Sequence, residues 1–188
     1  GAGKTAVVEL LAQRIARGEV PAKLRETRLI ELSVADLVAG SAFRGELEER
    51  LAQLVDELRG DRQTVLFVDE LHTLVGAGAG ASTGGGLDAV EALKPALARG
   101  EIALIGATTA EDYERSIARD PALARRLSRV AVDAPNEREA RAMLAAAALD
   151  LGAHHGVVYE DDAVHAAAVL CERFVPERAH PDKGVEAL

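Results

Sequence analysis

The sequence opens on the second half of a phosphate-binding loop. Its first residues are Gly1, Ala2, Gly3, Lys4 and Thr5, which match the end of the pattern G-x-x-x-x-G-K-[ST]. Apolar residues then recur at helical spacing up to Gly18, which predicts a helix over residues 4–17. A loop of backbone N–H groups that runs into a helix N-terminus surrounds phosphate with donors and a favourable dipole. The opening therefore predicts a nucleotide-binding α/β fold.

Lys4 and Thr5 have separate roles in this prediction. Lys4 supplies a positive charge for the outer phosphates of ATP, and Thr5 supplies a hydroxyl for Mg²⁺. A chance occurrence of the string in an Ala- and Gly-rich sequence is the alternative. Because Gly1 corresponds to the middle glycine of the pattern, we expect the first half of the loop and the strand before it to precede Gly1.

A pair of acids ends the most apolar short segment of the chain. The run from Thr64 to Val68 is typical of a strand buried on both faces of a parallel sheet, and Asp69 and Glu70 follow it. A nucleoside triphosphatase uses such acids beside the phosphate loop, Asp69 to hold Mg²⁺ and Glu70 to take a proton from the attacking water. Alone, the pair could be a solvated strand end. With Lys4 it predicts ATP binding, and less directly hydrolysis.

Predicted strands and helices alternate over most of the chain, which favours α/β layers with a mostly parallel sheet. Strands are predicted at residues 28–32, 64–68 and 102–105 with an extended segment at 129–132, and helices at 46–58, 88–99 (bent at Pro95) and 111–119. Residues 39–45 and the Gly-rich stretch 76–86 are predicted loops.

The pattern becomes purely helical towards the end of the chain. Asn136 is predicted to cap a helix that runs to about Leu151, and Asp161 or Asp162 to cap one that runs to about Arg173. We place a boundary near Pro135, between a large α/β subdomain at 1–135 and a small helical lid at 136–188, each expected to be incomplete at its outer end.

Composition excludes several partners. The formal net charge of -9 argues against a binder of nucleic acid or of anionic membranes, because both require a basic surface. No apolar run approaches the roughly 20 residues of a membrane-spanning helix. The single cysteine, Cys171, cannot form an internal disulfide, which favours a reducing, cytoplasmic compartment with Cys171 buried in a helix.

Five further segments carry a resemblance to a known family: LVAGSAFRGELEERL, VLFVDELHTLVGAG, LKPALARGE, IGATTAEDYERSI and DPALARRL. Together with the opening segment they resemble the first ATPase module of the Clp family of AAA+ ring-forming protein unfoldases and disaggregases. The resemblance implies a parallel sheet sandwiched by helices, followed by a small helical lobe. It also implies an ATP-hydrolysing motor that threads unfolded or aggregated protein through a hexameric pore, in some members towards a Clp-type peptidase.

The same resemblance assigns residues. Thr109, or Thr108 beside it, matches the sensor that positions water near the γ-phosphate; the alternative is a cap in a turn. Arg125 and Arg126 match arginine fingers that reach a neighbouring subunit's nucleotide; the alternative is a solvated basic helix end.

The predicted loop at residues 39–45 corresponds to the family's pore loop. Phe43, followed by Arg44, stands where the family grips the passing polypeptide, although Phe43 could instead fold back into the core. His72 follows the acidic pair as in the family, and we interpret it as structural rather than catalytic.

Two other functions stay open. The module could bind ATP chiefly to hold a ring together, with little hydrolysis of its own. A nucleic-acid-remodelling AAA+ ATPase is a further alternative, which the net charge disfavours.

Overall fold

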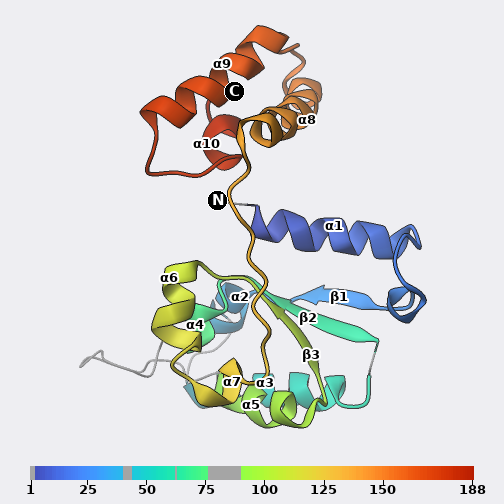
Figure 1. Cartoon of the computed structure of the whole chain (residues 1–188). Coiled ribbons are helices and arrows are strands. Elements are labelled where there is room, and N and C mark those ends of the chain that lie inside the picture. The colour runs from blue at the N-terminus through green and yellow to red at the C-terminus, as the bar shows by residue number, and fades with distance from the viewer. Residues whose placement is uncertain (1–2, 40–43, 62, 76–89) are drawn as a thin grey trace. The chain divides into compact units, whose positions relative to one another are not determined.

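The computed structural model describes residues 3–39, 44–61, 63–75 and 90–188 (Figure 1). The chain divides into two compact units. The first unit is Val8–Arg129, and the second is Val130–Leu188 together with Gly1–Val7.

A parallel sheet forms the centre of the first unit. Its strands are β1 (Arg28–Glu31), β2 (Thr64–Val68) and β3 (Ala103–Gly106), in the order β1-β2-β3. Within β2, Leu66, Phe67 and Val68 are buried, as the apolar run predicted. Because β2 pairs with both neighbours and all strands run in one direction, the chain leaves β2 and β3 at the same edge of the sheet.

Helices accompany this sheet in the first unit, although Lys4–Val7 at the start of the first helix belong to the second unit. They are α1 (Lys4–Ala16), η1 (Ala22–Leu24), α2 (Val34–Ala39), α3 (Arg44–Leu58), α4 (His72–Val75), α5 (Val90–Arg99), α6 (Ala110–Asp112), the π-helical η2 (Tyr113–Ile117) and α7 (Pro121–Ala124). Leu51 and Val55 of α3 and Leu93 and Leu97 of α5 join Leu66 of the sheet in one buried cluster. Leu51 and Val55 thus place one face of α3 in the core of the unit.

Several sequence predictions need correction. Arg44, predicted to lie in a loop, begins α3. Residues 129–132 form no strand. The predicted helix at 111–119 is a short α6 that continues into the π-helical η2. Phe43, the stretch 76–86 and the start of the helix predicted at 88–99 lie outside the described residues.

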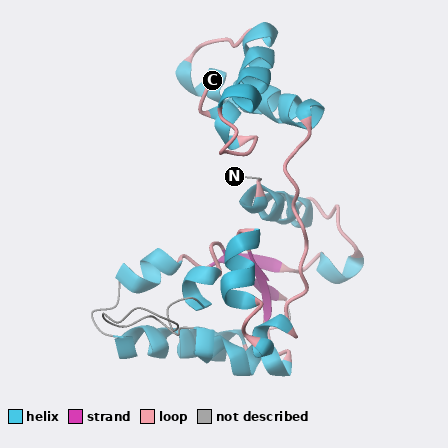
Figure 2. Ribbon diagram, turned by 60° about the vertical axis from the view of Figure 1, so that its left-hand side comes forward, coloured by secondary structure: helices cyan, strands magenta, loops and turns pink. Residues whose placement is uncertain are grey.

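The second unit contains helices and loops, as Figure 2 shows for its described part. Its helices are α8 (Glu137–His155), α9 (Asp161–Phe174) and α10 (Asp182–Val185). Asn136 caps α8 as predicted. Glu160 rather than Asp161 or Asp162 precedes α9, and its side chain makes no capping hydrogen bond.

The α8–α9 pair encloses a small core of its own. Leu144 and Ala148 of α8 pack with Val164 and Ala168 of α9. Cys171 is buried in α9, as predicted, and its thiol donates to the carbonyl of Lys183 at 3.4 Å. The domain boundary near Pro135 stays a prediction.

Over the described ranges, every helix is too short or too polar to cross a membrane.

Candidate active site

The edge of the sheet where the strands end brings together residues that are far apart in the sequence. Asp69 and Glu70 follow β2, and Thr108 and Thr109 come shortly after β3. Two backbone hydrogen bonds join these segments: Leu71 N donates to Ala107 O at 2.8 Å, and Ala107 N donates to Val68 O at 2.9 Å. The parallel pairing of β2 with β3 thus extends into the candidate site.

Glu70 has an unusual backbone. Its φ is +50°, the left-handed region that a non-glycine residue adopts at a cost of about 1–3 kcal/mol. Its backbone amide donates to Asp69 Oδ1 at 2.8 Å, and its side chain is 56% exposed. Such local strain concentrates at functional sites. The turn directs the Glu70 side chain to solvent at the sheet edge, where it can meet a bound substrate.

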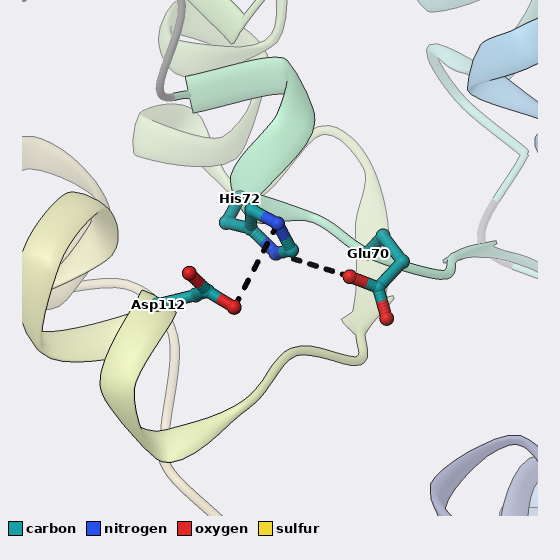
Figure 3. Close-up of side chains that lie close together, drawn as sticks. All are labelled: Glu70, His72 and Asp112. Carbon is teal, nitrogen blue, oxygen red and sulfur yellow. Dashed lines mark ion pairs between the residues drawn. The ribbon is translucent and has the colours of Figure 1, made fainter. Parts of the chain in front are cut away.

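His72 lies between two carboxylates (Figure 3). Its Nδ1 is 3.5 Å from Glu70 Oε2 and 3.0 Å from the hydroxyl of Thr108, while its Nε2 is 3.8 Å from Asp112 Oδ2. Ligand atoms of Glu70, His72 and Asp112 all lie within 4.8 Å of one another. Glu70 lies nearest Nδ1 and Asp112 lies nearest Nε2, however, so the two acids approach opposite nitrogens of the ring. The ring therefore bridges the two carboxylates, and this arrangement does not direct all three side chains at one shared ion.

Sequence reasoning missed this bridge. It treated His72 as structural and did not single out Asp112. A local signal did exist for Asp112, because Thr109 followed three residues later by an acid is the spacing of a helix cap.

Thr109 and Thr108 have different partners. Thr109 accepts a hydrogen bond from the Asp112 amide at 3.0 Å and donates one to Asp112 Oδ2 at 2.6 Å, so it caps α6. That donated hydrogen bond is the main reason that the pKa of Asp112 lies below its ordinary value; partial burial opposes it, and the charges of His72 and Arg115 contribute further. The Thr108 hydroxyl instead contacts His72.

Arg125 and Arg126 come directly after the short helix α7. Both are exposed, while Leu123 of the same helix is 1% exposed within the main core. The helix is therefore anchored by its apolar residue and presents the arginine pair to solvent.

The remaining predicted residues lie elsewhere or outside the described part of the chain. Lys4 and Thr5 begin α1 and are half-buried, and Gly3 before them has a φ of +79°. All three belong to a different unit from Asp69, so their pairing with the acids stays a prediction. Gly1, Ala2, Phe43 and the side chain of Arg44 lie outside the described residues.

Residues 1–133 match the "ATPase family associated with various cellular activities (AAA)", and residues 136–188 match the AAA lid domain.

The chain belongs to the AAA family of ATPases.

Named relatives narrow the branch of the AAA family. The chaperone protein ClpB of Aquifex aeolicus is 47% identical over 100% of this chain and 18% of the relative. ClpB of Pseudomonas putida is 47% identical over 100% of this chain and 22% of the relative. The chain thus spans about a fifth of the length of these curated relatives. The chloroplastic ClpB2 of Oryza sativa is 46% identical over 99% of this chain and 19% of the relative.

Solved structures similar to this chain point to the same branch of the AAA family. The Saccharomyces cerevisiae Hsp104–ADP complex has a TM-score of 0.87 and 38% identity, covering 98% of this chain and 31% of that chain. A closed state of Hsp104 with ATPγS and FITC casein has a TM-score of 0.82 and 38% identity, covering 98% of this chain and 32% of that chain. The predicted AAA+ fold and the resemblance to the Clp family are therefore confirmed.

Proposed function

We propose that this chain is the ATP-hydrolysing AAA module of a Clp-type protein unfoldase that works as a hexameric ring. One observation carries the proposal: the parallel strands β2 and β3 bring Asp69, Glu70 and the Thr108–Thr109 pair to one edge of the sheet in an AAA chain. An acidic pair beside polar hydroxyls on a rigid sheet edge suits the activation of water next to a phosphate.

Mg²⁺-ATP fits the donor set available. Lys4 and the backbone amides of residues 1–5 would bind the phosphates, while the Asp69 carboxylate and the Thr5 hydroxyl are the hard oxygen ligands that Mg²⁺ prefers. The metal would neutralise charge on the phosphate oxygens.

Glu70 is the proposed general base. Its exposed carboxylate would accept a proton as the water oxygen bonds to the γ-phosphorus and the bond from that phosphorus to the ADP oxygen breaks. Thr109, or Thr108, would orient the water. His72, 3.5 Å from Glu70, would restrict where the carboxylate can lie.

Arg125 and Arg126 are proposed to act on the nucleotide of the neighbouring subunit. Their exposure at the end of an anchored helix suits contact with a second copy of the chain. A guanidinium there would offset the charge of the transition state.

Unfolded or aggregated protein is the proposed substrate, and it would pass Phe43 and Arg44 in the pore. The similar closed state of Hsp104 was solved with FITC casein, which supports a polypeptide substrate for this chain. The relatives named above are chaperones, which favours a chaperone role over a partnership with a Clp-type peptidase.

The proposal is tested with Glu70→Gln in the intact protein. Glutamine keeps the shape of the side chain but cannot accept the proton, so ATP binding should persist while turnover falls about 100-fold or more. Equilibrium binding of a fluorescent ATP analogue and steady-state phosphate release measure the two separately. Near-normal turnover would reject Glu70 as the base.

A second function, ATP-gated ring assembly with little hydrolysis, follows from the same exposed arginine pair. Arg125→Ala separates the two roles. Loss of rings in sedimentation with hydrolysis per subunit intact would favour assembly; intact rings with slow hydrolysis would favour the finger role.

A further inference from the structure

A shielded ion pair joins α5 to the start of α7, the helix that the arginine pair directly follows. Lys94 Nζ lies 2.6 Å from Asp120 Oδ2, and the two side chains are 18% and 17% exposed. Ion pairs on an open surface contribute little because water screens them and their side chains stay mobile. Restricted exposure at both partners makes the Lys94–Asp120 pair a defined link between two elements.

Asp120 holds α7 at the same time. Its Oδ1 accepts hydrogen bonds from the amides of Ala122 at 2.9 Å and Leu123 at 3.2 Å, so it is the N-cap of α7. A helix of four residues has no stability of its own, and its direction depends on tertiary contacts. One carboxylate therefore both starts α7 and ties it to α5.

The α5 side of the link is anchored in the core. Leu93 on one side of Lys94, and Ala96 and Leu97 on the other, are buried in the main core. Leu123 of α7 lies in the same core cluster. Two contacts thus hold α7 in place. The Leu123 side chain packs in the same core as α5, and the Asp120 carboxylate pairs with Lys94 of α5.

Arg125 and Arg126 come directly after α7 in the sequence. Arg125 is the C-cap residue of α7, its amide donating to Leu123 O, and the amide of Arg126 also donates to Leu123 O, at 2.9 Å. Any rotation of the four-residue helix about Leu123 would move both guanidinium groups. The charge of Asp120 is retained at neutral pH: burial raises its pKa, but the hydrogen bonds from Lys94 and from the Leu123 and Ala122 amides together bring the pKa below the ordinary value.

We propose that Lys94 is a positioning residue for the arginine pair: by binding Asp120 it fixes the direction in which α7 presents Arg125 and Arg126 to the neighbouring subunit. The inference rests on the proposed trans role of these arginines. A misplacement of about 1 Å can cost roughly 100-fold in rate. Loss of the link is therefore expected to slow hydrolysis in the neighbour's site and to leave the variant's own ATP binding intact.

The test uses mixed rings of the intact protein. Subunits with Lys94→Met keep their own Glu70 but present displaced arginines. They are mixed with an excess of Glu70→Gln subunits, which hydrolyse ATP very slowly but present correctly held arginines. Hydrolysis per Lys94→Met subunit should rise about tenfold or more as each becomes the neighbour of a correct donor. The matched donor, Glu70→Gln with Lys94→Met, should give no rise. Equal effects of the two donors would overturn the proposal.

Two controls make the result specific. Arg99→Met removes a different ion pair of α5, the one with Glu101 just beyond the end of the helix; its rings should hydrolyse ATP at the normal rate. Asp120→Asn keeps a side chain that can cap α7 but removes the charge, and should reproduce the Lys94→Met defect without adding to it in the double variant. A normal rate for Asp120→Asn would also contradict the link.

The experiment separates this inference from the proposed function. Subunits with both arginines changed to alanine should be rescued by the Glu70→Gln donor in the same way. If they are not, the trans role itself is wrong. If they are rescued and Lys94→Met is not, only the positioning role of Lys94 is wrong. Circular dichroism and ring sedimentation of each variant identify any that fails to fold or to assemble.

Discussion

Nδ1 of His72 lies 3.0 Å from Oγ1 of Thr108, so a residue that follows β2 contacts a residue that follows β3. The ring also approaches Glu70 at 3.5 Å. His72 thus connects the proposed general base with the segment that carries the proposed sensor. His72 and Thr108 are far apart in the sequence, and they meet at the edge of the sheet where the proposed ATP hydrolysis would take place.

His72→Ala is expected to lower kcat for ATP hydrolysis about tenfold while changing ATP affinity little, because it frees the Glu70 carboxylate without removing it. His72→Asn should recover part of kcat, since its amide can still bond to Thr108. Steady-state kinetics and ATP-analogue binding give the two readouts. His154→Ala, on the exposed surface of α8, is the control. A rise in KM with normal kcat would instead place His72 in substrate binding.

Gly106→Ala is expected to destabilise the first unit. A Cβ at this position would lie 2.3 Å from Cδ2 and 3.1 Å from Cβ of Leu71, which is itself 2% exposed. Overpacking of this kind costs about 1–3 kcal/mol of unfolding free energy. Urea denaturation should show that combining Gly106→Ala with Leu71→Ala costs less than the sum of the two single changes. Strict additivity would show that the two side chains do not compete for the same space.

Asp120→Asn should change how stability depends on pH. Because the folded protein lowers the pKa of Asp120 below its ordinary value of 3.8, the carboxylate stabilises the fold fully above the unfolded pKa. That contribution disappears as pH falls through the lower, folded pKa. Thermal unfolding at pH 7 should therefore show the Asp120→Asn variant less stable than wild type, and the difference should shrink below about pH 4. A difference independent of pH would mean that the charge is not responsible.

Asn136→Ala is expected to destabilise the second unit by about 1 kcal/mol. The Asn136 side chain accepts a hydrogen bond from the backbone amide of Glu139 at 3.0 Å, and the Glu139 carboxylate accepts one from the backbone amide of Asn136 at 2.9 Å. Together these two hydrogen bonds form a capping box. Asn136→Ser should be close to neutral because serine also caps. Urea denaturation compares the three proteins; equal losses for alanine and serine would show that capping is not the cause.

Local features could be predicted from the sequence because their cause is local. The apolar run of β2 matches its observed bounds, since a strand buried on both faces needs uninterrupted apolar residues. Asn136 caps α8 because its partner is only three residues away. The spacing of apolar residues likewise identifies α1, and the helix predicted at 46–58 matches α3 except for its start at Arg44.

The sequence by itself also determined which candidate chemistry this protein carries, because the acids after β2 and the GAGKT opening are contiguous motifs. Only the tertiary structure decided what surrounds them. The His72 bridge to Glu70 and Asp112 exists because β2 and β3 are parallel neighbours, and the Lys94–Asp120 link exists because α5 and α7 share one core. The spacing of apolar residues in the sequence does not predict such contacts. They depend on the order of the strands and on which helix faces meet, and these are set by the packing of the whole unit.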